Sequence, residues 1–226
     1  VKEMLGACLR AQGKTFITKA NLNSNLGVPL TLANMPRNCD YAVIEMGISH
    51  IGEMHELSDL VRPDVSLITN IQPAHQEFFK TPLITAQEKA HIFDYQNKIG
   101  TAVINADTLC AKELIHSAIE QNIRHIVKFG LDEEAQYHLQ TLSIDLTGQS
   151  VVARLFGEEF PFHMRFMGEH YALDALAVLA VIDALAASVP KAIRTLEELL
   201  PVAGRGQAQE ITLNGKRSEE RRVGKE

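Results

Sequence analysis

The chain has 226 residues, 46% of them hydrophobic and 22% charged, with a formal net charge of −6 at pH 7. This composition predicts a globular core, whereas the negative charge argues against a nucleic-acid binder that depends on neutralising phosphates. The longest apolar run, Tyr171 to Val189, contains Asp174 and Asp183, which a membrane span would tolerate poorly. Since no signal peptide precedes the first predicted helix and no CxxC pair occurs, we expect a cytoplasmic protein with reduced cysteines. We also expect a monomer that does not insert into membranes.

Apolar runs of strand length alternate with helical patterns along the first 130 residues. This order predicts an α/β fold: a mostly parallel sheet with right-handed crossovers, flanked by helices. The run from Tyr41 to Met46 is nearly all apolar, as expected for a central parallel strand. The other strands predicted in this part cover 14–18, 64–69, 101–105 and 124–129, and the helices cover 2–12, 52–61, 83–95 and 108–122.

The pattern changes between Tyr137 and Arg165, where short strands are separated by turn signals such as Gly157. An antiparallel hairpin region is therefore expected beside the parallel sheet. Two more helices are predicted over about 170–187 and 190–200, the second starting at a proline, followed by a last strand at 210–213.

The two ends of the chain differ from the rest. The chain opens on Val1 in mid-helix pattern without an initiator Met, so we expect that upstream residues are missing. Residues 217–226 are almost wholly charged and lack apolar periodicity, which predicts a frayed or non-native tail. One domain is expected over 1–206, with 207–226 as the start of an interdomain segment and the tail.

Polar groups follow two of the predicted strands. Glu45 lies at the carboxyl end of one strand, His75 follows the next, and Lys89 lies on the helix after it. Because ligands bind at the carboxyl edge of open parallel sheets, we expect these three side chains to form one site. Taken singly, each would also fit a capped turn, a satisfied histidine or a solvated lysine.

Three asparagines, Asn21, Asn23 and Asn25, alternate around a predicted helix start. Capping the helix would occupy one of them. Three side chains that both donate and accept hydrogen bonds exceed that need, so contact with a ligand is a second interpretation.

Motifs spread in order over residues 1–206 resemble the Mur ligase family, the ATP-dependent amide-bond ligases of peptidoglycan precursor synthesis. The resemblance covers the family's central, P-loop NTPase-like ATP-binding domain without its phosphate loop, which would end just before Val1. The segments that carry it include Asn21-Leu22-Asn23-Ser24-Asn25, Tyr41-Ala42-Val43-Ile44-Glu45-Met46-Gly47, His75 with Glu77-Phe78-Phe79, Lys89 with Ile92-Phe93, Gly168-Glu169-His170 and Gly204-Arg205-Gly206.

The resemblance implies roles for the residues of the predicted site. Glu45 and His75 would bind Mg²⁺ ions that bridge ATP and substrate, although histidine is a second-best ligand for magnesium. Lys89 would be a carbamylated lysine, which adds an anionic oxygen ligand for the second metal and acts as a catalytic residue. The three asparagines would lie by the nucleotide-sugar substrate or the metal.

Further residues would contact the nucleotide. Arg205 would meet the ATP phosphates; a surface arginine in a glycine turn is the plainer interpretation. His170 and Asp174 belong to a pattern that contacts adenine, Gly-x-His-Asn-x-x-Asn, in which this chain has Tyr171 and Asp174 at the asparagine positions. A carboxylate accepts but does not donate, so a contact with both the adenine amino group and its ring nitrogen is put in doubt.

The implied reaction uses ATP and Mg²⁺ to add D-alanyl-D-alanine to UDP-N-acetylmuramoyl-tripeptide through an acyl phosphate, and the segment alone is expected to be inactive. Two alternatives stay open. Another ligase of this fold would add a different amino acid or glutamate, and a non-catalytic nucleotide-binding domain would share the fold without the reaction.

Overall fold

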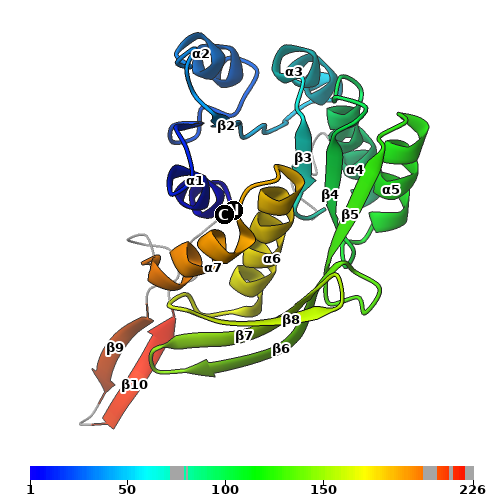
Figure 1. The fold of residues 1–226 in the computed structure, drawn as a ribbon. Helices are drawn as coiled ribbons and strands as arrows, with labels where there is room; N and C mark the ends of the chain where they lie inside the picture. The colour runs from blue at the N-terminus through cyan, green and yellow to red at the C-terminus, as the bar shows by residue number, and fades with distance from the viewer. Residues whose placement is uncertain (72–78, 80, 201–207, 214–215, 222–226) are drawn as a thin grey trace.

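The computed structural model describes residues 1–71, 79 and 81–200, and the backbone of 208–213 and 216–221 (Figure 1). The predicted boundary at 206 lies outside the described residues, so the division into a domain and a tail stays a prediction. The helices are α1 (Lys2–Arg10), α2 (Gly27–Ala33), α3 (Glu53–Val61), α4 (Pro82–Ala90), the 3-10 turn η1 (His91–Phe93), α5 (Ala111–Glu120), α6 (Glu169–Ala184) and α7 (Val189–Glu198).

A six-stranded sheet forms the body of the molecule, in the order β3-β4-β5-β6-β7-β8. The strands from β3 to β6 are parallel, and β7 and β8 continue the sheet antiparallel. This arrangement confirms the α/β class and the added hairpin region. The strands are β3 (Val65–Ile68), β4 (Thr101–Asn105), β5 (His125–Gly130), β6 (Tyr137–Asp145), β7 (Gly148–Leu155) and β8 (Glu158–Met164).

Two short sheets are separate from this body. The strands β1 (Thr15–Ile17) and β2 (Tyr41–Val43) pair with each other in parallel and with no other described strand. The structure thus confirms a parallel strand in the predicted range 41–46, shorter than predicted and with one neighbour among the described strands, and its central position stays a prediction. A continuous apolar run indicates that both faces of a strand are buried, but it does not indicate how many strands pair with that strand.

The second separate sheet lies at the carboxyl end of the chain. There the backbone forms the antiparallel pair β9 (Ala208–Leu213) and β10 (Lys216–Arg221) (Figure 1). Part of the charged end that was expected to fray is thus a strand.

Apolar side chains form two cores, one on each face of the six-stranded sheet. The first contains α1, α6 and α7, with eight consecutive positions of α6, from Ala175 to Ile182, all buried. The second lies under α3, α4 and α5 on the opposite face. Figure 1 shows α6 held between α1 and the curved hairpin strands β6 to β8, with α4 and α5 on the far side of β4 and β5. Among the described helices, none has the length and apolar character needed to cross a lipid bilayer.

Candidate functional site

Glu45 lies two residues beyond β2, in a position set by Thr18. The Thr18 side chain is fully buried after β1; its hydroxyl accepts a hydrogen bond from the Glu45 amide at 2.9 Å and donates to the Val43 carbonyl at 3.4 Å. These two bonds end the β1–β2 pairing and turn Glu45 outward. Its carboxylate is 43% exposed and is shared by Lys2, whose Nζ lies 3.0 Å from Oε2, and Asn23, whose Nδ2 lies 3.1 Å from Oε1.

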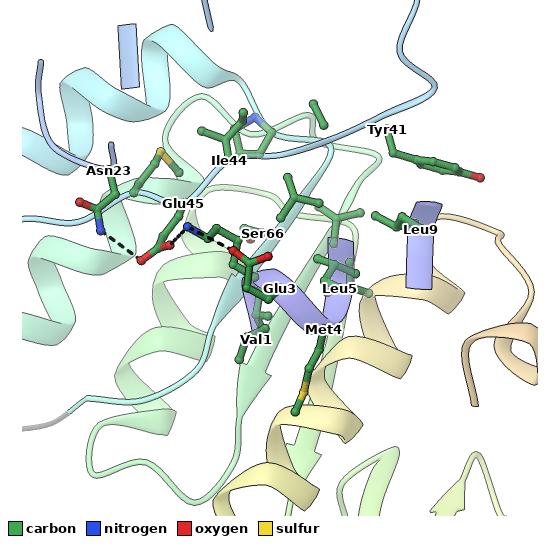
Figure 2. A pocket seen from close by; sticks show the side chains of 18 of the residues that line it. Val1, Glu3, Met4, Leu5, Leu9, Asn23, Tyr41, Ile44, Glu45 and Ser66 are labelled. Atoms are coloured by element: carbon green, nitrogen blue, oxygen red, sulfur yellow. Dashed lines mark hydrogen bonds and ion pairs between the residues drawn. The ribbon is translucent and has the colours of Figure 1, made fainter. Parts of the chain in front are cut away.

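Asn23 is the asparagine most closely tied to Glu45. Its carbonyl oxygen accepts a hydrogen bond from the Gly47 amide at 2.7 Å, and a Cβ at Gly47 would come within 3.1 Å of the Asn23 amide nitrogen. Glycine therefore lets the two loops approach. Figure 2 shows Asn23 and Glu45 facing each other beside a cleft.

The other two asparagines differ from Asn23. Asn21 also lines the cleft, whereas Asn25 is exposed and lines neither of the two cavities at this edge. No asparagine caps α2, because its first amide, that of Gly27, instead meets the Ser24 hydroxyl at 3.3 Å.

The cleft has a volume of about 1290 Å³ and lies between the free edges of β2 and β3, with α1 along one wall. Figure 2 shows Met4, Leu5 and Leu9 of α1 against it, together with Tyr41 and Ile44. The polar residues that line it include Lys2, Asn21, Asn23, Glu45, Lys89 and Asp174. The structure therefore brings Glu45 and Lys89 to one cavity, as the sequence predicted.

Lys89 lies in the last turn of α4, a helix that begins with a Thr81 cap and a proline in its first turn. Its Nζ donates to the Asn70 carbonyl at 2.9 Å. The Asn70 side chain is held in turn by the Thr108 hydroxyl at 3.0 Å. Burial lowers the pKa of Lys89 below the usual value, because desolvation disfavours the charged ammonium.

A second cavity of about 540 Å³ adjoins the cleft, since Lys89 and Asp174 line both. His170, in the first turn of α6, also lines this second cavity and stacks on Tyr171 with ring centroids 4.1 Å apart. Burial raises the pKa of Asp174, because desolvation disfavours the charged carboxylate.

Two predicted site residues, His75 and Arg205, lie outside the described residues, and their roles stay predictions. Sequence reasoning missed Lys2, Thr18 and Asn70, which hold Glu45 and Lys89 in place. Only Asn70 had a usable signal, because it directly follows the strand 64–69 at the expected ligand edge.

The donor set at Glu45 fits a hard divalent cation. Mg²⁺ prefers carboxylate oxygens, and the Glu45 carboxylate is partly exposed. The Lys2 ammonium, 3.0 Å from this carboxylate, would have to move aside, because it places a positive charge next to the cation. Lys89 as an ammonium offers no ligand atom, so it would join such a site only after conversion to an anionic oxygen donor.

Comparison with known proteins shows which family model and which relatives the chain matches. The Mur ligase middle domain matches residues 1–182. The UDP-N-acetylmuramoyl-tripeptide–D-alanyl-D-alanine ligase of Rickettsia prowazekii is 30% identical over 91% of this chain and 46% of its own length. The corresponding ligase of Escherichia coli is 42% identical over 47% of this chain and 24% of its own length.

Solved structures of ligases with the same name have a similar fold to this chain. MurF from Acinetobacter baumannii superposes with a TM-score of 0.85 at 28% identity, covering 93% of this chain and 45% of that one. MurF ligase from Thermotoga maritima in complex with ADP gives a TM-score of 0.82 at 26% identity, covering 92% and 47%. The chain thus spans less than half the length of these relatives.

Proposed function

The chain belongs to the Mur ligase family, and we propose that a protein of its relatives' length containing this chain adds D-alanyl-D-alanine to UDP-N-acetylmuramoyl-tripeptide at the expense of ATP. The observation that carries the proposal is the cleft that Glu45, Asn23 and Lys89 line, in a chain matched over most of its length by a ligase of that name. The predicted monomeric state and cytoplasmic location stay predictions.

The chemistry would proceed in two steps. The terminal carboxylate of the tripeptide attacks the γ-phosphorus of ATP, giving an acyl phosphate and ADP; the amine of D-alanyl-D-alanine then attacks the acyl carbon, and phosphate leaves. Phosphoryl transfer requires mainly positioning and charge neutralisation. Glu45 would hold a Mg²⁺ ion, which supplies that neutralisation when bound, and Lys2 and Asn23 would orient the Glu45 carboxylate. Asn21, which lines the cleft, is proposed to lie by the nucleotide-sugar substrate. Asn25 lines neither cavity, so its contact with that substrate stays a prediction from the sequence.

Lys89 is proposed to carry a carbamate. A neutral amine adds to CO₂ and releases a proton, which leaves an anionic oxygen pair on the side chain that can act as a metal ligand. The reaction needs the unprotonated amine, and the burial that lowers the pKa of Lys89 supports this role. His170 and Asp174 are proposed to face the nucleotide base from the second cavity, with His75 and Arg205 as the remaining metal and phosphate contacts.

The test is ATP-dependent phosphate release by the full-length protein. We expect release only when UDP-N-acetylmuramoyl-tripeptide and D-alanyl-D-alanine are both present. Release with a single amino acid or glutamate in place of the dipeptide would indicate another ligase of the family. No release with any of these amines would indicate a nucleotide-binding domain without catalysis and would overturn the proposal.

Two variants test the residues in the same assay. We expect Glu45→Gln and Lys89→Arg each to lower turnover by about 100-fold, because each removes an anionic oxygen from the metal site. The matched controls are Glu56→Gln and Lys112→Arg, both at exposed positions outside the two cavities. Turnover of Glu45→Gln equal to that of Glu56→Gln would make the metal assignment untenable.

A further inference from the structure

We propose that His55, His91 and Asp94 form a binding site for a zinc-like divalent metal, separate from the proposed ATP site. The three residues come from two elements: His55 lies in the first turn of α3, His91 opens η1, and Asp94 follows it. None of them lines either cavity of the candidate functional site. The inference does not depend on the proposed function.

The geometry of the three side chains carries the proposal. Nδ1 of His55 and Nδ1 of His91 both point at the same carboxylate oxygen, Asp94 Oδ2, at 2.6 and 2.8 Å. The three ligand atoms lie within 4.8 Å of one another, and no other such group of histidine, cysteine or acidic residues occurs in the part of the chain that the structure describes.

The ligand chemistry favours a borderline metal ion. Two neutral imidazoles and one carboxylate suit Zn²⁺ or a neighbouring transition metal, whereas Mg²⁺ prefers an all-oxygen shell. In a tetrahedral zinc site with ligand bonds of 2.0–2.1 Å, ligand atoms lie about 3.3 Å apart. The two rings must therefore separate from Asp94 by roughly half an ångström. They are free to do so, because their side chains are 50% and 46% exposed.

Neighbouring side chains are placed to support the three ligands. Gln121 Nε2 donates to the second oxygen of Asp94 at 3.1 Å, so the carboxylate is anchored from the far side. The Tyr95 hydroxyl lies 3.3 Å from His55 Nε2. When a metal takes Nδ1, the imidazole proton moves to Nε2, and the Tyr95 oxygen can accept it. Outer partners of this kind orient metal-binding histidines.

The backbone around the site is also fixed. The Ser58 hydroxyl of α3 donates to the Ile92 carbonyl at 2.9 Å and accepts from the Tyr95 amide at 3.3 Å. A metal ion at this point would link α3 to the segment that directly follows α4, the helix that carries Lys89. The ion itself would lie outside the cleft. Lys98 opposes the metal, because its Nζ lies 3.4 Å from the Asp94 carbonyl and adds a positive charge nearby.

The experiment titrates the chelator-treated protein with Zn²⁺ alone and, separately, with Mg²⁺ alone, and follows binding by calorimetry and the melting temperature. We expect one Zn²⁺ to bind per chain and to raise the melting temperature, with Mg²⁺ giving no such rise at this site. Substituting Co²⁺ should give the visible absorption of a site with nitrogen and oxygen ligands.

Variants locate the bound ion. His55→Gln and His91→Gln should each weaken Zn²⁺ binding by about 10- to 100-fold. Asp94→Asn keeps an oxygen that accepts both imidazole hydrogen bonds but removes the charged ligand, so it should fold and still bind weakly. The control is His116→Gln. The exposed His116 imidazole lies 3.2 Å from Glu120, one turn along the same helix, and is not part of the three-residue cluster. If Zn²⁺ does not bind, or if all three ligand variants leave its binding unchanged, the three side chains only hydrogen-bond to one another and the proposal is overturned.

Discussion

Glu53 shows how one carboxylate organises the loop that leads into α3. Its Oε2 accepts hydrogen bonds from the amides of Ser49 at 2.6 Å and His50 at 3.0 Å. Desolvation raises the pKa of Glu53, but these hydrogen bonds and the nearby His50 outweigh it and lower the pKa below its usual value. The charged form is therefore favoured by folding.

The sign of the pH dependence follows from this lowered pKa. The stabilisation is complete above the unfolded-state pKa, about 4.3, and is lost as the pH falls through the lower folded-state pKa. We expect Glu53→Gln to lower the free energy of unfolding at pH 7 by about 1 kcal/mol. The difference from wild type should shrink below about pH 4. Urea unfolding of wild type and Glu53→Gln at pH 7 and below about pH 4, with Glu56→Gln as control, measures this difference in unfolding free energy. If the difference is as large in acid as at pH 7, the charge of Glu53 is not its cause.

Some site residues could be predicted and others could not, for a physical reason. Glu45 and Lys89 were expected together because residues near the carboxyl ends of consecutive parallel strands converge on one edge of a sheet. They line one cavity although β2 and β3 lie in separate sheets, and their roles there stay predictions. Lys2 was missed as a site residue because its role depends on where α1 lies relative to β2, which no local pattern encodes. Asn25 continues the alternation of Asn21 and Asn23 in sequence, but it is exposed and lines neither cavity.

At the scale of elements, α3 is capped by a side chain from another helix. The buried carboxylate of Glu88, on α4, accepts hydrogen bonds from the Gly52 amide at 2.9 Å and the Met54 amide at 3.0 Å. Gly52 itself has φ of +95° at the helix start and offers no side chain. The spacing of apolar residues predicted both helices. The cap could not be predicted in this way, because Glu88 lies 36 residues from Gly52 and no local sequence pattern links the two.

We expect Glu88→Ala to lower the free energy of unfolding by about 2–3 kcal/mol, because it leaves buried helix-terminal amides without a charged acceptor. Glu88→Gln keeps one acceptor oxygen and should cost less than Glu88→Ala. Equilibrium denaturation by urea gives both values, and Glu56→Ala on the exposed face of α3 is the matched control. Equal losses for Glu88→Ala and Glu56→Ala would show that α3 does not depend on this cap.

At the scale of the whole chain, the described strands β1 and β2 pair apart from the six-stranded sheet, where a continuous sheet was expected. The alternation of strands and helices predicted the class and the strand order along the chain, and the six-stranded sheet confirms the hairpin addition. It did not predict the cleft of about 1290 Å³ between β2 and β3. Strand patterns specify which residues are buried, but the pairing of strands distant in sequence is decided by the packing of helices such as α1 and α6 against them.

This division should make the two parts of the molecule unequal in stability. β4 is buried at all five positions and lies between β3 and β5, whereas β2 has partly exposed residues and pairs only with β1. Hydrogen bonds in the β1–β2 pair include Thr18 N to Val43 O and Tyr41 N to Lys14 O; those around β4 include Thr101 N to Asp64 O and Ala106 N to Phe129 O. Local opening needs less free energy where fewer apolar contacts must be broken.

Native-state hydrogen exchange measures this difference directly. We expect the amides of Thr18 and Tyr41 to exchange about 100-fold faster, after correction for intrinsic rates, than those of Thr101 and Ala106. Denaturant should then accelerate the β4 amides with a steeper dependence, because their exchange requires opening of the six-stranded sheet and exposes more surface. If all four amides gave the same opening free energy and the same denaturant dependence, β1 and β2 would unfold as one cooperative unit with the main sheet, and the cleft between them would not divide the molecule energetically.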